Sequence, residues 1–506
     1  MIDDLKRTWL VLSGCLLLAA PAAVQAQTGS GDNFDYAINP GDTNDITITK
    51  YTGTNAVVTI PTNINELTVT AIAQNAFENF TILTSITIPG SVTTIGTQAF
   101  VNCTGLTNAT LSNGVTTIGD DVFNGCSSLA SVTIPDSVTS IGAGVFMVNT
   151  SLPGITIPGS VTNIGQYALQ GCAKLTNVTL SNGLTSIGMY IFDGCSILPR
   201  ITIPGSVTNI GEYAFYQCKG LTNAILSSGA TSIGDYMFDD CLSLASVTIP
   251  GSVTYIGTNA FYGCSKLASV AIPGGVTNIG EGAYEGCAKL TNATLSDGLA
   301  SIGQEMFDGC SSLASVTIPD SVTSIGADAF EGCTSLASVT IPGSVAKIGA
   351  DAFEGCTKLT NAIISSGATS IGAYAFQACT KLAGVYFGGN APTAYSTSFA
   401  SDNNPAVYYL PGTTGWADFS AITGLTPVLW NPLIQAVGVN FGVQNNQFGF
   451  NITGATNFTV VVEACTNLAN PVWTSLQTLT LTNGSFYFTD PQWTNYSARY
   501  YGLGLP

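Results

Sequence analysis

Histidine is absent from this 506-residue chain, and its absence decides which chemistry the other side chains could perform. Without an imidazole there is no Ser-His-Asp or Cys-His catalysis, no zinc-protease helix and no histidine ligand for a metal. Carboxylates are the reactive groups that are left, because the chain carries 30 Asp and Glu residues. A glycosidase would need two of them about 5–9.5 Å apart in a cleft.

Acidic residues return every 23 residues in the later part of the chain and form a ladder. One column holds Glu285, Asp308, Glu331 and Glu354, with Glu305, Asp328 and Asp351 close by. A ladder supplies paired carboxylates everywhere, but a repeated surface has no deep pocket to raise a carboxyl pKa, so we predict no catalytic residue and no enzyme.

The repulsion within this ladder has to be offset, because like charges at strand spacing destabilise a sheet. We expect solvent and the nearby Lys266, Lys289, Lys347 and Lys358 to offset it. A low-affinity calcium site is the alternative, although the chain has no EF-hand or nonapeptide calcium motif. We therefore predict no metal and no cofactor.

Twelve cysteines share the 23-residue spacing, and Asn149 fills the one gap inside their series. In-register stacking would place successive Cβ atoms about 4.8 Å apart and pointing the same way, whereas a disulfide needs about 3.8 Å. We predict buried free thiols that act as small apolar side chains. The twelve are Cys103, Cys126, Cys172, Cys195, Cys218, Cys241, Cys264, Cys287, Cys310, Cys333, Cys356 and Cys379.

Four tyrosines occupy one position of four consecutive units: Tyr167, Tyr190, Tyr213 and Tyr236. Stacked at strand spacing they would form an aromatic stripe about 15 Å long. Rigid aromatic side chains offer much contact area at low entropic cost, which suits a glycan or a protein partner. Ring stacking that only stabilises the coil is the alternative. These four are our candidate ligand-binding residues.

An outward column on the main predicted strand is mostly threonine, from Thr87 to Thr340. Regular threonine ladders can match an ice lattice, which makes ice binding an alternative function. Threonine is also simply a good strand residue on a polar face.

These columns exist because the chain repeats itself every 23 residues without an insertion, which is typical of a solenoid. One leucine marks fourteen units, from Leu83 and Leu106 through to Leu359 and Leu382. In the unit 83–105, Ile86 and Ile88 alternate with polar residues and predict a strand with one buried face. Pro89-Gly90 then ends the strand.

The second half of each unit predicts another short extended piece and a return. In 83–105 the extended piece runs from Val92 to Ile95, and the segment from Ala99 to Cys103 predicts a short helical or 3₁₀ turn. Fourteen coils about 4.8 Å apart would make a rod of roughly 65 Å. The fold class we predict is a mainly β leucine-rich-repeat solenoid with a small C-terminal antiparallel β-sandwich.

The unit L-x-x-I-x-I-P-x-x-V-x-x-I-G-x-x-A-F-x-x-C resembles the bacterial surface leucine-rich repeats called BspA-like, over residues 83–390. The upstream piece "VVTIPTNINELTVTAIAQNAF", 57–77, resembles the N-terminal cap of that family. The resemblance implies a secreted or surface-displayed solenoid used for adhesion or protein recognition. It implies no catalytic residues.

The two ends of the chain differ from the repeat. Residues 1–26 carry two basic residues, an apolar run and small residues at the end, which predicts a cleaved signal peptide; the lipobox-like stretch ending at Cys15 makes a lipoprotein the alternative. We expect a cap and degenerate first repeat at 27–82, the solenoid at 83–390, a cap and linker at 391–432 and the sandwich at 433–506. The sandwich resembles modules that close secreted bacterial repeat proteins, and it could anchor, export or bind.

The net charge of the chain limits the kinds of molecule that it can bind. The net charge is −18 with only 12 Lys and Arg, so a phosphate backbone has nothing to bind and nucleic acid is excluded. No segment after the leader has the roughly 18–20 apolar residues of a membrane span, and the oligomeric state is open. We predict an exported, non-catalytic scaffold that recognises an extracellular protein or glycan; alternatives are a structural spacer or surface lattice without a ligand, and a carboxylate glycosidase.

Overall fold

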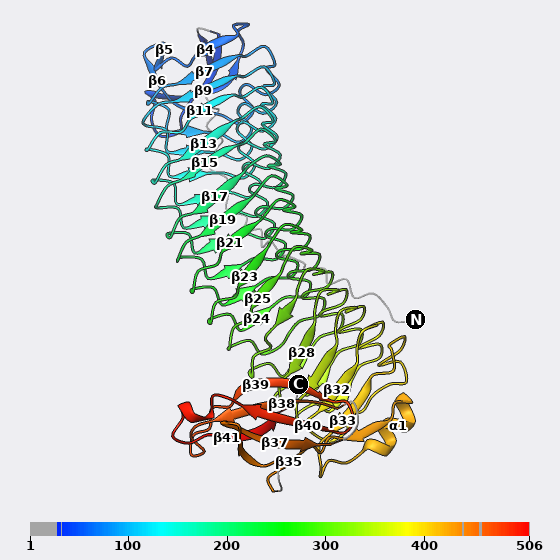
Figure 1. Ribbon diagram of the computed structural model, residues 1–506. Helices are drawn as coiled ribbons and strands as arrows, with labels where there is room; N and C mark the ends of the chain where they lie inside the picture. The colour runs from blue at the N-terminus through cyan, green and yellow to red at the C-terminus, as the bar shows by residue number, and fades with distance from the viewer. Residues whose placement is uncertain (1–27, 32, 438–439, 455–457, 505–506) are drawn as a thin grey trace.

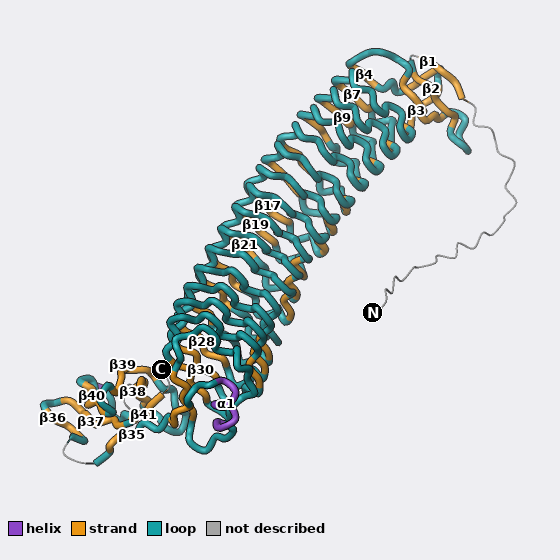
Figure 2. Tube along the Cα trace, turned by 90° about the vertical axis from the view of Figure 1, so that its right-hand side faces the viewer, coloured by secondary structure: helices purple, strands orange, loops and turns teal. Residues whose placement is uncertain are grey.

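The computed structural model of the chain describes residues 28–31, 33–437, 440–454 and 458–504. The predicted signal peptide and Cys15 lie outside these residues. The chain coils into a long curved rod that carries a small β module at its C-terminal end (Figure 1). Turned by 90°, the same rod shows its strands in rows along its length (Figure 2).

The first strand row runs the whole length of the rod and contains one strand from each coil. From Ser85 to Phe387 its parallel strands pair at offsets of 23 residues, for example Ile86 with Ala109 and Val339 with Ala362, which confirms the solenoid and its gapless period. At the two ends of the row the offset differs, since Val58 pairs with Ile86 and Val385 with Val407. The row comprises β4 (Val57–Thr59), β7 (Ser85–Ile88), β9 (Asn108–Leu111), β11 (Ser131–Thr133), β13 (Gly154–Ile157), β15 (Asn177–Leu180), β17 (Arg200–Ile203), β19 (Asn223–Leu226), β21 (Ser246–Thr248), β23 (Ser269–Ala271), β25 (Asn292–Thr294), β26 (Ser315–Val316), β28 (Ser338–Ile341), β30 (Asn361–Ile364), β32 (Gly384–Phe387), β33 (Ala406–Tyr409) and β34 (Pro427–Leu429).

The second strand row is built from shorter strands that follow the Pro-Gly turn of each coil. It also pairs in parallel at 23 residues, as Ile118 does with Ile141. The row comprises β6 (Leu67–Ile72), β8 (Thr94–Ile95), β10 (Thr117–Ile118), β12 (Ser140–Ile141), β14 (Asn163–Ile164), β16 (Ser186–Ile187), β18 (Asn209–Ile210), β20 (Ser232–Ile233), β22 (Tyr255–Ile256), β24 (Asn278–Ile279), β27 (Ser324–Ile325), β29 (Lys347–Ile348) and β31 (Ser370–Ile371).

The third side of the coil is a turn face, built from the segment that includes the Ala-Phe pair. Hydrogen bonds from residue i to i−3, such as Cys103 N–H to Phe100 O at 3.2 Å, give it the local character of a 3₁₀ turn. Left-handed residues at two positions, Gln98 and Asn102 in this coil, stop it from becoming a helix. Its alternate N–H groups donate to carbonyls of the next coil, so the turn face is also a hydrogen-bonded ladder.

The core is made of columns of identical side chains. Phe215 and Phe238 stack with ring centroids 5.2 Å apart and planes 7° from parallel, and the same contact recurs along the rod. Tyr284 stands in this phenylalanine column, fully buried. Its hydroxyl has no hydrogen-bond partner. Stacking of this kind adds about 0.5–1.5 kcal/mol per pair beyond the burial of area.

The cysteine column lies beside the phenylalanines, and all twelve thiols are buried and free, which confirms that prediction. Each thiol donates to the carbonyl 26 residues earlier, as Cys103 Sγ does to Phe77 O at 3.1 Å. Asn149 does the same with Nδ2, 3.1 Å from Phe123 O. Therefore the column requires a small buried hydrogen-bond donor, and not specifically a sulfur.

The N-terminal end is closed by an antiparallel layer. In this layer β2 (Phe34–Ile38) pairs antiparallel with β1 (Thr28–Gly31) on one side and with β3 (Asp45–Tyr51) on the other. β3 then pairs in parallel with β6, and β5 (Asn63–Ile64) pairs antiparallel with β6. Tyr51 stacks on Phe77 at 5.1 Å and ends the aromatic column. The stretch 57–77 contributes β4 and β6 to the two strand rows, so it forms a coil beneath this layer.

At the other end, β33, α1 (Trp416–Thr423) and β34 complete the last coils. Trp416 covers the core edge on Tyr409 and Phe387. The predicted antiparallel module follows and has two sheets. The first sheet contains β35 (Leu433–Gln435), β36 (Gly442–Gln444), β37 (Gln447–Thr453) and β40 (Ser485–Asp490). The second contains β38 (Phe458–Cys465), β39 (Thr474–Leu481) and β41 (Tyr500–Gly504), and the short 3₁₀ helix η1 (Trp493–Asn495) lies between β40 and β41 in the chain. The two sheets share a core that includes Phe450 and Val460.

Candidate functional site

The four predicted tyrosines lie together on the turn face as a continuous stack. Ring centroids are 5.3 Å apart for Tyr167 and Tyr190, and 4.5 Å apart for both Tyr190–Tyr213 and Tyr213–Tyr236. The last two pairs are within 8° of parallel. All four side chains are half-buried, so one edge of the stack faces solvent.

Every tyrosine of the stripe has a left-handed backbone, with φ between 54° and 60°. The position is left-handed in fourteen consecutive coils, and seven of its ten occupants outside the stripe are the residues that tolerate this conformation best, Asn, Asp and Gly. The full column is Asn75, Gln98, Asp121, Gly144, Tyr167, Tyr190, Tyr213, Tyr236, Asn259, Gly282, Glu305, Asp328, Asp351 and Tyr374. It follows that Glu305, Asp328 and Asp351 continue the line of the tyrosines.

The free-energy cost of a left-handed backbone makes tyrosine an unusual residue at this position of the coil. A left-handed residue with a Cβ costs about 1–2 kcal/mol, so four tyrosines cost about 4–8 kcal/mol. Their three stacked contacts return about 1.5–4.5 kcal/mol beyond the area that the rings bury. Asn, Asp or Gly at this position would avoid much of the strain. Strained residues of this kind cluster at binding and switch sites.

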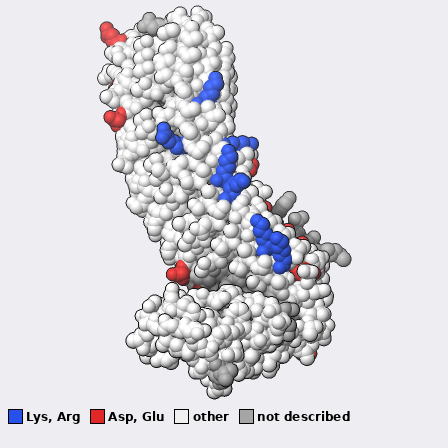
Figure 3. Space-filling view, viewed as in Figure 1, with Lys and Arg blue, Asp and Glu red and all other residues white. Residues whose placement is uncertain are grey.

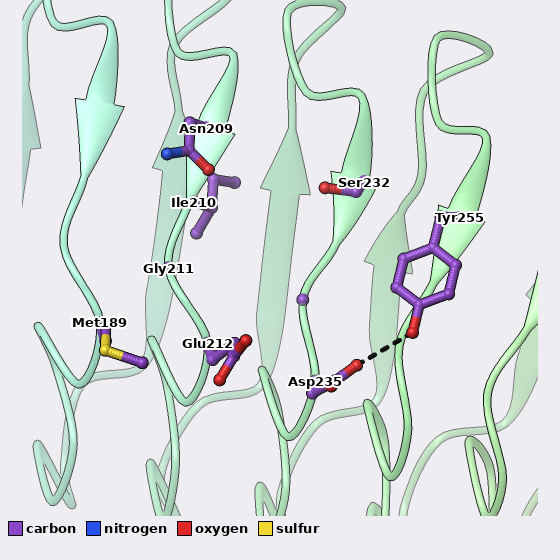
Figure 4. A pocket seen from close by; sticks show the side chains of 9 residues that line it. Met189, Asn209, Ile210, Gly211, Glu212, Ser232, Asp235 and Tyr255 are labelled. Atoms are coloured by element: carbon purple, nitrogen blue, oxygen red, sulfur yellow. Dashed lines mark hydrogen bonds between the residues drawn. The ribbon is translucent and has the colours of Figure 1, made fainter. Parts of the chain in front are cut away.

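A shallow groove borders the stripe. A hollow of about 360 Å³ is lined by Met189, Glu212 and Asp235, each of which directly precedes a tyrosine of the stripe, and by Asn209 and Tyr255 from the second strand row (Figure 4). A second hollow, of about 480 Å³, shares Met189 and Asn209 with the first and extends toward the N-terminus. The groove therefore lies along the coils that carry the stripe, and its lining does not include the four tyrosines themselves.

Polar contacts along this groove are formed between adjacent coils. Tyr255 Oη donates to Asp235 Oδ1 at 3.1 Å (Figure 4), and the backbone N–H of Thr258 donates to the same oxygen at 2.9 Å. Burial raises the pKa of Tyr255, and the charge of Asp235 raises it further. The tyrosine hydroxyl is therefore neutral near pH 7 and can exchange its hydrogen bonds with a ligand.

Sequence reasoning missed two aromatic residues beside the stripe, Tyr216 and Tyr255. Tyr216 lies edge-on to Tyr213, with centroids 5.7 Å apart and planes at 83°. Its place three residues after Tyr213 in the same turn could have indicated this. Burial by neighbouring rings and the presence of Tyr190 and Tyr236 raise the pKa of Tyr213 to about 12. The Tyr213 phenol is therefore an uncharged donor and acceptor near pH 7.

The acidic column runs beside the continuation of the stripe. Burial and the neighbouring carboxylates raise the pKa of Glu285 and of Glu331 to about 7. Among the described parts of the chain the only salt bridge joins Arg499 to Asp490, so no described lysine forms an ion pair with the ladder. Lysines and acids lie on different columns, and few charges of either sign show on the face in Figure 3. The ladder ends where Gln377 Nε2 donates to Glu354 Oε1 at 2.7 Å.

The acidic ladder is not arranged as a metal site. Within the residues that the structure describes, no group of three or more acidic or cysteine side chains is placed to hold a metal ion. The carboxylates are strung along the rod one coil apart, so they do not converge on one point.

The outward threonine column on the first strand row faces solvent for most of its length. Its last member, Tyr386, is 3% exposed because it stacks with Tyr408 at 4.9 Å under the C-terminal module. Other threonines have a structural role: Thr116 Oγ1 donates to Thr93 O at 3.0 Å, and this contact recurs at many coils. Such bonds explain why threonine is abundant without requiring ice binding.

No helix in the described ranges is long and apolar enough to cross a membrane.

The sequence matches the model of the BspA type leucine rich repeat region over residues 51–176, 162–291 and 277–406. No curated protein matches the chain.

The solved structures that are similar to this chain include two bacterial leucine-rich repeat proteins. A leucine-rich repeat protein from Bacteroides ovatus is 31% identical, with a TM-score of 0.62, over 71% of this chain and 94% of that one. A leucine rich cell surface protein from Faecalibacterium prausnitzii is 33% identical, with a TM-score of 0.45, over 66% of this chain and 94% of that one.

Proposed function

The chain belongs to the BspA-type leucine-rich repeat family, and from this we propose that it is a non-catalytic scaffold that recognises an extracellular protein or glycan. The binding surface is the tyrosine stripe with the groove beside it. The signal-like segment 1–26 supports export to the cell surface or beyond.

The observation that carries this proposal is the strained stack of four tyrosines. The buried positions of the repeat are nearly the same in every coil, and they do not require any particular residue on the surface. At the stripe, an energetically costly residue replaces tolerant ones in four consecutive coils, next to a hollow of about 360 Å³. The exposed parts of the tyrosine rings offer apolar contact area, and their hydroxyls offer hydrogen bonds, to a sugar ring or to the side chains of a protein.

The test is a glycan and protein array probed with the purified chain, followed by a variant with all four stripe tyrosines changed to Asn. Asparagine tolerates the left-handed backbone, so the variant should fold at least as well. Tyr374→Asn is the matched control, since Tyr374 has φ 59° in the same column and is 40% exposed but stands apart from the stack.

We expect the wild type and Tyr374→Asn to capture the same ligand, and the stripe variant to bind it at least tenfold more weakly. Equal capture by all three would remove the stripe from the binding surface. Self-assembly with no capture at all would favour a spacer or lattice protein.

A further inference from the structure

The C-terminal module has a surface unlike that of the rod, because it is nearly free of charge and rich in exposed rings. Residues 433–504 contain only three charged side chains, Glu463, Asp490 and Arg499. On the face drawn in Figure 3 the module is white throughout. Four large side chains that border one hollow are at least 40% exposed: Phe441, Leu468, Trp473 and Tyr500.

That hollow has a volume of about 400 Å³ and lies between the two sheets at their open edge. Its inner wall is aromatic: Phe448 stacks on Tyr501 at 5.2 Å, with planes 12° apart. Trp473 lies against β41 at Gly502, where a Cβ atom would come within 3.2 Å of the indole. Glycine at 502 therefore allows the indole to stay beside the cavity. This size and lining are typical of a small-molecule pocket.

One polar group is buried beside this aromatic wall, the guanidinium of Arg499. Its side chain is 9% exposed, and Nη1 lies 3.1 Å from Asp490 Oδ2. That oxygen already accepts from Tyr501 Oη at 2.8 Å, and Nη1 makes no hydrogen bond of its own. Arg499 borders this hollow and two neighbouring ones of about 270 and 300 Å³. A buried N–H group that is held only by an ion pair leaves hydrogen-bonding capacity unused, and a ligand oxygen would satisfy it.

We propose that this cavity is a second binding site, separate from the stripe, for one or two units of an uncharged oligosaccharide. A sugar ring has an apolar C–H face, which meets the negative face of Trp473 or Tyr500, and hydroxyls at its rim, which accept from Arg499 Nη1. The volume of the hollow accommodates a ligand of this size.

Charge selects a neutral ligand over an ionic one. The positive charge of Arg499 is balanced by Asp490, so the site does not attract anions over distance. Asp490 has no capacity left for a cation, because Oδ1 accepts from the N–H of Gln492 at 2.8 Å and Oδ2 is engaged by Tyr501 and Arg499. The exposed rings favour a ligand with flat apolar faces.

The experiment titrates the full chain with cellohexaose, maltohexaose, mannohexaose and chitohexaose, and with hexagalacturonate as an acidic counterpart. Binding is followed by tryptophan fluorescence and by calorimetry, in the wild type, Trp473→Ala and Arg499→Lys. Tyr487→Ser is the matched control, since Tyr487 is 38% exposed in the same module but does not line the cavity.

We expect at least one neutral hexaose to bind, with at least tenfold loss in Trp473→Ala, a smaller loss in Arg499→Lys and none in Tyr487→Ser. The four-tyrosine stripe variant should bind it as the wild type does. The proposal is overturned if no neutral hexaose binds the wild type, if Trp473→Ala binds as well as wild type, or if hexagalacturonate binds more tightly than all four. Unchanged melting of Trp473→Ala guards against a loss of binding through unfolding.

Discussion

Replacing Asp402 by Asn should make the C-terminal end of the solenoid more stable at pH 8 and remove most of its pH dependence. Asp402 stands 23 residues after Cys379, at the end of the column where each side chain donates to a carbonyl 26 residues earlier. A carboxylate cannot donate, and both Asp402 oxygens are buried without a partner. Asparagine already serves as this donor at position 149.

The magnitude follows from the pKa of Asp402, which burial raises from 3.8 to about 8. In the unfolded chain the carboxyl ionises near pH 4, while in the folded protein it stays protonated up to about pH 8. The stability contributed by the protonated form is therefore complete below pH 4 and is lost as the pH rises through 8. The full linkage would be about 6 kcal/mol; solvent screening at this half-buried residue reduces it to about 1–3 kcal/mol.

The assay is hydrogen exchange by mass spectrometry between pH 5 and pH 8.5, corrected for intrinsic rates. Peptides covering residues 376–409 should lose protection as the pH rises in the wild type and keep it in Asp402→Asn. Asp418→Asn is the matched control, since Asp418 is an exposed acid in the same cap. If the Asp402→Asn variant lost protection with pH as the wild type does, or was less stable at pH 8, the role assigned to the column would be refuted.

Three further changes test the core and the acidic ladder. Asn149→Cys should raise the free energy of unfolding by about 1 kcal/mol, measured by urea denaturation, because it removes the buried Oδ1 that has no partner; a loss of stability would contradict the donor column. Tyr284→Phe should raise the melting temperature, because it removes a buried hydroxyl without a partner and keeps the ring stack; a lower value would show that the hydroxyl is satisfied. Glu331→Gln should reduce the loss of stability between about pH 4.5 and 7. Burial and the carboxylates of Asp308 and Glu354 raise the pKa of Glu331 to about 7, so its protonated form favours folding. If the melting temperature depended on pH as it does in the wild type, solvent would be screening the ladder.

The surface positions show the limit of reading columns from sequence. The spacing of Tyr167, Tyr190, Tyr213 and Tyr236 was enough to predict their stack, because residues 23 apart meet in adjacent coils. Tyrosine is not typical of a left-handed backbone, so these four residues did not indicate it; the Asn, Asp and Gly residues at the same position of other coils could have. Spacing along the chain also does not say on which side of the coil a long side chain lies, so it did not show that the lysines form no ion pair with the acids.

What the sequence alone determined is the solenoid: its period, its buried columns, its free thiols and the absence of histidine chemistry. A coil contacts only its neighbours, so every core contact is a fixed step along the chain and is visible as a repeat. Only the tertiary structure decided which surfaces could bind. The groove combines side chains from the second strand row and the turn face, and the cavity at Arg499 joins strands paired over long, irregular separations, such as Phe448 with Asp490. No period records those separations, because antiparallel pairing in the module is set by side-chain packing and turn geometry.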